Sequence, residues 1–164
     1  MKTLKIFIVL LITTISAKAQ FTKAELQVSG LTCSMCSKAT EKSLRTLEFI
    51  GDIKVDLNRN VFLITFKKDA PVNLDQISKK VQNAGFSVNN LKATFNFDNV
   101  KIANNTFNYA GDTYHLVNTG DKILSGPVAV TVVDKGFAPA AVYKKYSNNT
   151  SDKSESGRTY HIAI

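Results

Sequence analysis

Residues 24–95 alternate between a hydrophobic pattern typical of strands and one typical of helices. Apolar residues recur at every second position in the strand-like segments and at every third or fourth position in the helix-like ones. The pattern predicts strands at residues 25–29, 52–57, 61–66 and 86–95, and helices at residues 37–47 and 74–84. The segments therefore follow the order strand, helix, strand, strand, helix, strand.

Both predicted helices have a side that can pack against a sheet. The buried stripe of the first is predicted to consist of Cys36, Ala39, Leu44 and Leu47, and that of the second of Leu74, Ile77, Val81 and Ala84. Asn73 is the predicted N-cap of the second helix, and Gly85 lies where that helix should end. This βαββαβ order predicts an α+β, ferredoxin-like domain over residues 20–96, with both helices on one face of the sheet.

Residues 97–164 have a different pattern, with many turn residues between short β-like runs. The predicted strands are residues 100–102, 106–109, 113–118, 128–134 and 158–164, and a short helix is predicted at residues 139–146. Ala110-Gly111-Asp112 is the predicted loop of a hairpin. We predict a small β-rich domain, with a small barrel as one architecture. Its alternative is an extension of the first domain's sheet.

The face of the predicted strand 61–66 that points away from the helices carries Val61, Leu63 and Thr65. A sheet face in contact with water is usually polar. Because two of these three residues are apolar, we expect the C-terminal segment to pack on this face.

The N-terminus has the features of a cleaved export signal. Met1 to Lys5 is short and basic, residues 6–15 are mostly apolar, and Ala17-Lys18-Ala19 places small residues on both sides of a lysine before Gln20. These features predict a signal peptide at residues 1–19, and therefore a periplasmic or secreted protein. The other apolar runs are too short to span a bilayer, so we do not expect a membrane-embedded protein.

The formal net charge is +8. Lys2, Lys5 and Lys18 lie before the predicted cleavage site, and the other basic residues are spread among acidic ones. A nucleic-acid-binding surface would need a dense basic stripe. We therefore exclude nucleic acid as a partner.

The most specific chemical feature is Gly30-Leu31-Thr32-Cys33-Ser34-Met35-Cys36, which contains both cysteines of the chain. It joins the first predicted strand to the first predicted helix, so both thiols can face the same ion. A disulfide between them would close too short a loop to constrain much of the unfolded chain. The remaining alternatives are a soft-metal site and a redox-active dithiol.

This segment resembles the metal-binding loop of the heavy-metal-associated domain family. The family occurs in copper chaperones, in the N-terminal domains of metal-transporting P-type ATPases and in periplasmic mercury-binding proteins. The strand Ile53-Lys54-Val55-Asp56-Leu57 and the segment Ala84-Gly85-Phe86 also match the family. The resemblance implies that Cys33 and Cys36 bind the metal. Leu31 replaces the methionine usual in the family, a buried packing residue, and should be tolerated.

Two thiolates suit a soft, low-coordinate ion, whereas zinc usually takes four ligands. Cu(I) is therefore the first expectation, followed by Hg(II) and then Zn(II). The predicted function is binding of the ion for transfer, scavenging or homeostasis, without catalysis. The partner would be another metal-binding domain or a membrane transporter. The alternatives are a thiol-disulfide oxidoreductase using the same cysteines and a mercury(II) scavenger.

Both histidines lie in near-identical tetrapeptides, Thr113-Tyr114-His115-Leu116 and Thr159-Tyr160-His161-Ile162. If these strands pair in register, His115 and His161 lie side by side and could form a second metal site. The simpler interpretation is two ordinary strands whose residue types favour β-structure, each histidine being exposed or hydrogen-bonded. We favour the simpler interpretation on the sequence alone.

Overall fold

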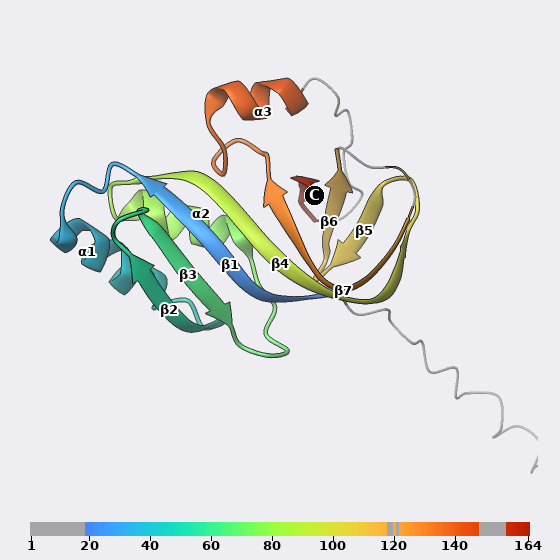
Figure 1. The fold of residues 1–164 in the computed structure, drawn as a ribbon, viewed down its shortest axis with the longest axis horizontal. Coiled ribbons are helices and arrows are strands. Elements are labelled where there is room, and N and C mark those ends of the chain that lie inside the picture. The colour runs from blue at the N-terminus through green and yellow to red at the C-terminus, as the bar shows by residue number, and fades with distance from the viewer. Residues whose placement is uncertain (1–18, 118–119, 121, 148–156) are drawn as a thin grey trace, which may run out of the picture.

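A computed structural model describes residues 19–117, 120, 122–147 and 157–164 (Figure 1). The predicted signal peptide lies outside these ranges, apart from Ala19, the first residue of β1. In chain order the elements are β1 (Ala19–Ser29), α1 (Ser34–Leu44), β2 (Ile50–Asp56), β3 (Val61–Phe66), α2 (Leu74–Asn83), β4 (Ser87–Ile102), β5 (Thr106–Tyr109), β6 (Asp112–Leu116), β7 (Lys122–Val132), α3 (Ala140–Ser147) and β8 (Thr159–Ala163). Within the described ranges, no helix has the length and hydrophobicity needed to cross a membrane.

The first part of the chain has the predicted ferredoxin-like βαββαβ arrangement. Its strands are ordered β2-β3-β1-β4, and all neighbouring pairs are antiparallel. The predicted limits of α2 are confirmed, because the Asn73 side chain accepts a hydrogen bond from the backbone N–H of Gln76 at 3.0 Å. At its other end Gly85 has φ +89°, and the N–H of Phe86 donates to the carbonyl of Val81. This is the Schellman ending that a glycine favours.

The C-terminal part continues the same sheet. β4 is 16 residues long and pairs with β7, giving one eight-stranded sheet in the order β2-β3-β1-β4-β7-β8-β6-β5. The barrel considered for this part is not formed, because β2 and β5 are the unpaired edges of an open sheet. β4 also crosses the predicted domain boundary at residues 96 and 97. Independent folding of residues 20–96 and 97–164 stays a prediction.

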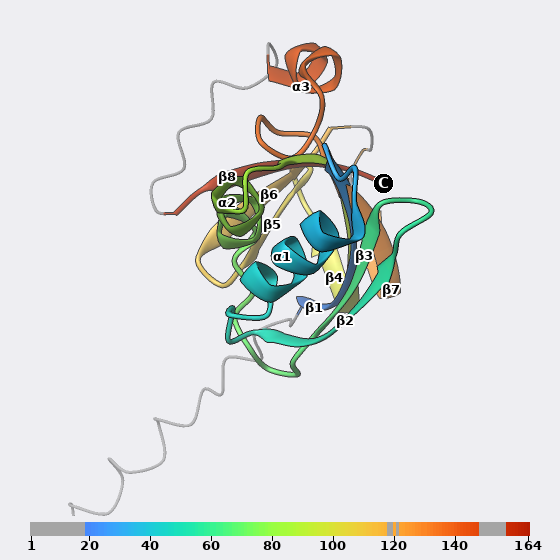
Figure 2. The same cartoon turned by 90° about the vertical axis from the view of Figure 1, so that its left-hand side faces the viewer.

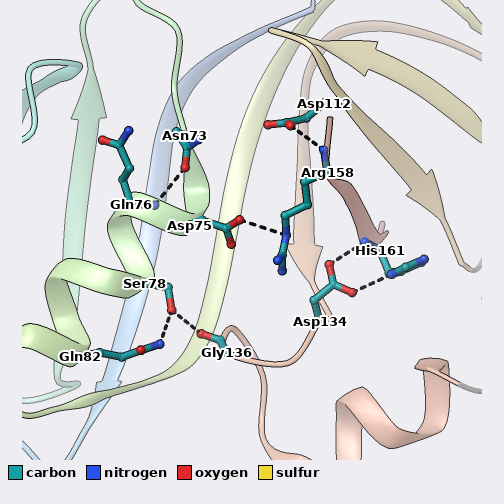
Figure 3. Close-up of polar contacts among 10 residues, drawn as sticks. All are labelled: Asn73, Asp75, Gln76, Ser78, Gln82, Asp112, Asp134, Gly136, Arg158 and His161. Carbon is teal, nitrogen blue, oxygen red and sulfur yellow. Dashed lines mark hydrogen bonds and ion pairs between the residues drawn. The ribbon is translucent and has the colours of Figure 1, made fainter. Parts of the chain in front are cut away.

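The sheet curls so that β5, β6 and β8 come round towards α2 (Figure 2). Polar side-chain contacts join the two parts. The Tyr109 hydroxyl donates to the carbonyl of Ala70, just before α2, at 3.3 Å. Arg158 Nε lies 3.2 Å from Asp75 Oδ2, and Ser78 Oγ donates to the carbonyl of Gly136 at 2.9 Å (Figure 3).

A shared aromatic core also joins the two parts. Phe95 in β4 is fully buried, with its ring centre 3.8 Å from that of Phe21 in β1 and 5.3 Å from that of Tyr114 in β6. Phe107 and Tyr109 also pack edge-on against Phe95. Burial of large aromatic surfaces is a main source of stability, so β4 is a structural element of both parts.

The outer face of β3 does not receive the C-terminal segment. The Leu63 side chain on this face is 39% exposed. The expectation of packing on this face was wrong, because β7 adds to the edge of the sheet at β4 instead. Sheet extension satisfies the backbone hydrogen bonds of β4, which a segment stacked on the face would leave unpaired.

Candidate functional site

The two cysteines lie on the loop from β1 to α1 and on the first turn of α1. The loop leaves β1 through Gly30, whose φ of +88° is in the region that L side chains rarely adopt. Leu31 then inserts into the hydrophobic core with only 8% of its surface exposed. Its predicted role as a tolerated packing residue agrees with this position. Leu31 therefore fixes the start of the loop, while the residues after it turn outward.

Cys33 caps the N-terminus of α1. Its φ and ψ of −147° and 157° are extended, and its Sγ accepts a hydrogen bond from the backbone N–H of Cys36 at 3.2 Å. The N–H of Ser37 donates to the Cys33 carbonyl, also at 3.2 Å. A sulfur at this position faces the unpaired amides and the positive end of the helix dipole, both of which favour a thiolate.

The buried stripe of α1 differs from the predicted one. Ser37, Thr40 and Leu44 are buried, Cys36 is partly buried, and Ala39 is exposed. Thr40 can be fully buried because its hydroxyl donates to the carbonyl of Cys36 at 3.1 Å. The prediction counted only apolar residues, and it therefore placed Ala39 on the buried side of α1, although Ala39 is exposed. The buried Thr40 hydroxyl holds the turn that carries Cys36, and the sequence pattern missed this residue.

The two thiols have opposite pKa shifts. The pKa of Cys33 is lowered, first by the hydrogen bond from the Cys36 side chain and then by the Cys36 backbone N–H. The pKa of Cys36 is raised, first by that same side-chain hydrogen bond, then by desolvation and the negative charge on Cys33. A hydrogen bond to a thiolate stabilises the acceptor's charged form and the donor's neutral form. Cys33 is therefore the thiol that loses its proton first as the pH rises.

This asymmetry predicts the order of alkylation. At neutral pH, iodoacetamide should modify Cys33 before Cys36, since the thiolate is the reacting form. Cys36→Ala removes the largest cause of the lowered pKa, so Cys33 should then react more slowly at the same pH. Cys33→Ala should speed up the reaction of Cys36. Mass spectrometry of partly alkylated peptides gives both rates, and faster reaction at Cys36 in the unsubstituted chain would contradict the assignment.

Both cysteines are free, with Cys33 exposed and Cys36 partly buried. Met35, between them, is 72% exposed. In the described ranges, no cluster of three or more histidine, cysteine or acidic residues could hold a metal ion. The donors that the structure brings together here are two thiol sulfurs. This set fits a soft ion of low coordination number better than a four-coordinate one.

Comparison with known proteins agrees with the fold and with the resemblance of the loop. The family model of the heavy-metal-associated domain matches residues 25–87, which include both cysteines, both sheet-covering helices and Phe86. Residues 25–87 are a heavy-metal-associated domain. The matched range ends where β4 begins, so β4 continues from this domain into the C-terminal strands.

Curated relatives and solved structures match a similar part of the chain. A copper-transporting ATPase from Helicobacter pylori is 33% identical over 85 residues, which cover 49% of this chain and 11% of the ATPase. The chain thus spans about a tenth of that relative's length. The solution structure of apo-CopP from Helicobacter pylori is 32% identical, covering 40% of this chain and 97% of CopP with a TM-score of 0.36. The yeast copper transporter domain CCC2A is 27% identical, covering 41% and 90%, with a TM-score of 0.37.

The structure also places both histidines. β6 and β8 pair in parallel with His115 opposite His161, the register that the repeated tetrapeptides would produce. Asp134 contacts His161 from the segment after β7. The contact joins residues 27 positions apart, and nothing in the local sequence of Asp134 indicates it.

Proposed function

We propose that the chain is an exported metal-binding protein that holds Cu(I) between Cys33 and Cys36. The observation that carries the proposal is the pair of free thiols at the exposed N-terminus of α1, inside a heavy-metal-associated domain. Helix N-terminal amides stabilise the negative charge of a bound dithiolate. The protein's role is to bind and pass on the ion without catalysis.

Copper is the proposed ion because of the donor set. The described ranges supply two thiol sulfurs here and no group of three or more histidine, cysteine or acidic residues that could hold a metal ion, whereas a structural zinc site has four ligands. Soft thiolate donors favour Cu(I). The matched relatives include ATPases described as copper-transporting, which supports copper over other soft ions. Hg(II) is the second candidate and Zn(II) the third.

The position of the thiols supports transfer. Cys33 is exposed, and Cys36 lies one helical turn from it. An incoming thiolate from a partner can bind the ion before one of these two cysteines leaves. The proposed partner is a second metal-binding domain or a membrane transporter that presents its own cysteines, and scavenging of excess ion would use the same site.

Export is part of the proposal and rests on residues 1–19. Their basic start, apolar run and small residues before Gln20 are typical of a signal peptide. Mass spectrometry of protein from the cell envelope or medium should find Gln20 as the N-terminal residue. Retention of residues 1–19 would contradict cleavage.

Anaerobic titration of the reduced chain tests the binding function. In competition with a chelator, Cu(I) should bind at one equivalent and more tightly than Zn(II). No uptake of Cu(I), Hg(II) or Zn(II) after full reduction would contradict the function. The lowered pKa of Cys33 is the observation that favours the competing oxidoreductase function. Catalytic reduction of insulin disulfides, together with weak metal binding, would establish that alternative.

A further inference from the structure

The two histidines of the chain lie side by side on one face of the C-terminal sheet. Parallel pairing of β6 with β8 aligns Tyr114 with Tyr160 and His115 with His161. Both tyrosines are fully buried and stacked, with ring centres 5.1 Å apart. Because side chains alternate across a strand, the histidines share the opposite face. Their ring centres are 5.7 Å apart, with an angle of 76° between the ring planes.

Asp134 fixes the orientation of His161. Its Oδ1 lies 2.6 Å from Nδ1 of the imidazole, and its Oδ2 accepts a hydrogen bond from the His161 backbone N–H at 2.9 Å (Figure 3). Both side chains are largely buried, at 13% exposed for His161 and 15% for Asp134. The carboxylate therefore assigns the ring proton to Nδ1 and leaves the lone pair on Nε2.

One nitrogen of each ring has no hydrogen-bond partner among the described residues. His161 Nε2 and His115 Nδ1 are buried and make no hydrogen bond within the described part of the chain. Buried polar atoms without a partner are destabilising and uncommon, so each such atom calls for an explanation. Two of these atoms lie on neighbouring imidazoles, and a carboxylate holds one of the two rings, so a single metal ion can serve as the partner of both nitrogens.

We propose that His115 and His161 form a second metal site, separate from the cysteines, for a late first-row divalent cation, Cu(II) above all. A metal–imidazole bond is about 2.0–2.1 Å, so each ring centre lies roughly 3 Å from the ion, and rings 5.7 Å apart can share it. Imidazole suits copper, nickel and zinc, and Cu(II) has the highest affinity among them.

Asp134 is a positioning residue in this site. A metal-binding histidine commonly donates its other ring N–H to a carboxylate, which orients the ring and raises its basicity. In the described ranges, no group of three or more histidine, cysteine or acidic side chains could hold a metal ion, so the ligands that this site supplies are the two imidazoles. The site uses neither Cys33 nor Cys36, and it can exist whether or not the cysteines bind Cu(I).

The test uses the full chain with Cys33→Ser and Cys36→Ser, which removes the thiols. Because the sequence has only two histidines, imidazole signals in Cu(II) electron paramagnetic resonance report this site alone. We expect one equivalent of Cu(II) with two nitrogen ligands. His115→Gln and His161→Gln should each weaken binding at least tenfold, whereas Thr159→Val, a control on the same strand, should not.

Asp134→Asn should weaken binding about 10–100-fold. In the His161→Gln background it should have no further effect on affinity, which separates positioning from a general loss of structure. NMR of the chain with both histidines intact gives a test without histidine variants: Cu(II) should broaden both imidazole C2–H signals together. No stoichiometric binding, broadening of only one signal, or binding that survives loss of either histidine would overturn the shared site.

Discussion

Replacing either Cys33 or Cys36 with serine should lower the affinity for Cu(I) at least about a hundredfold. Structural metal sites with four ligands are worth about 10–16 kcal/mol, so one ligand contributes a few kcal/mol, and each 1.4 kcal/mol is tenfold in affinity. A site with two protein ligands divides its binding free energy between only two residues, so each cysteine contributes a larger part of it. Chelator competition under anaerobic conditions measures the loss, and the double variant should retain no thiol-dependent binding.

The matched control for this prediction is Met35→Leu. It removes the third sulfur of the loop and keeps the side chain's approximate volume, at a position that is 72% exposed. The affinity for Cu(I) should be unchanged. A loss as large as that of the cysteine variants would show that the thioether is a ligand and that the two-thiolate site is incorrect.

Phe95→Ala should destabilise the whole chain by about 3–5 kcal/mol, the usual cost of removing a buried phenylalanine. Phe95 is fully buried, and its ring contacts Phe21 from β1 and Tyr114 from β6. Since small domains are typically stable by about 5–15 kcal/mol, this loss is a large part of the total. Urea denaturation of both proteins measures the difference.

Two probes can show whether the sheet unfolds as a unit. All five tyrosines lie in the C-terminal part, at Tyr109, Tyr114, Tyr143, Tyr146 and Tyr160. Far-UV circular dichroism, to which α1 and α2 contribute as the two longest helices of the described ranges, reports mainly the heavy-metal-associated domain instead. The two transitions should coincide and shift together in Phe95→Ala. Ile123→Ala, at an apolar position 68% exposed in β7, should change stability by about 0.5 kcal/mol or less. Separate transitions would contradict the shared core.

Local patterns predicted the type and order of the elements of the heavy-metal-associated domain, although α1 lies three residues earlier than its predicted limits of 37–47. The alternation in β3 is clear because one of its faces lies on the core, and Asn73 and Gly85 mark the ends of α2. The buried side of α1 was harder to predict. Thr40 is buried through a hydrogen bond to the Cys36 carbonyl, and a count of apolar residues cannot anticipate such a contact.

Extension of the first domain's sheet was predicted only as the alternative to a separate small domain, because the attachment of the C-terminal part depends on which strands pair. The hairpin of β5 and β6 was predicted from Ala110-Gly111-Asp112, and it is local. Pairing of β4 with β7 joins residues far apart in sequence, and no short-range pattern specifies such partners.

In the candidate sites too, features that are local in sequence were predicted and contacts between distant residues were not. Cys33 and Cys36 were identified because their spacing and the start of α1 are local features. The side-by-side position of the histidines was a conditional prediction from two similar tetrapeptides, and the structure confirms that register. Asp134 could not be found in this way, because its contact with His161 depends on the pairing of β7 with β8.

X-ray absorption spectroscopy at the copper edge, with one equivalent of Cu(I) bound to the reduced chain, tests the central claim most directly. The spectrum should show two sulfur ligands and no imidazole scattering, because Cys33 and Cys36 hold the ion together. A single sulfur ligand, or a shell of nitrogen and oxygen, would contradict a site built from this thiol pair.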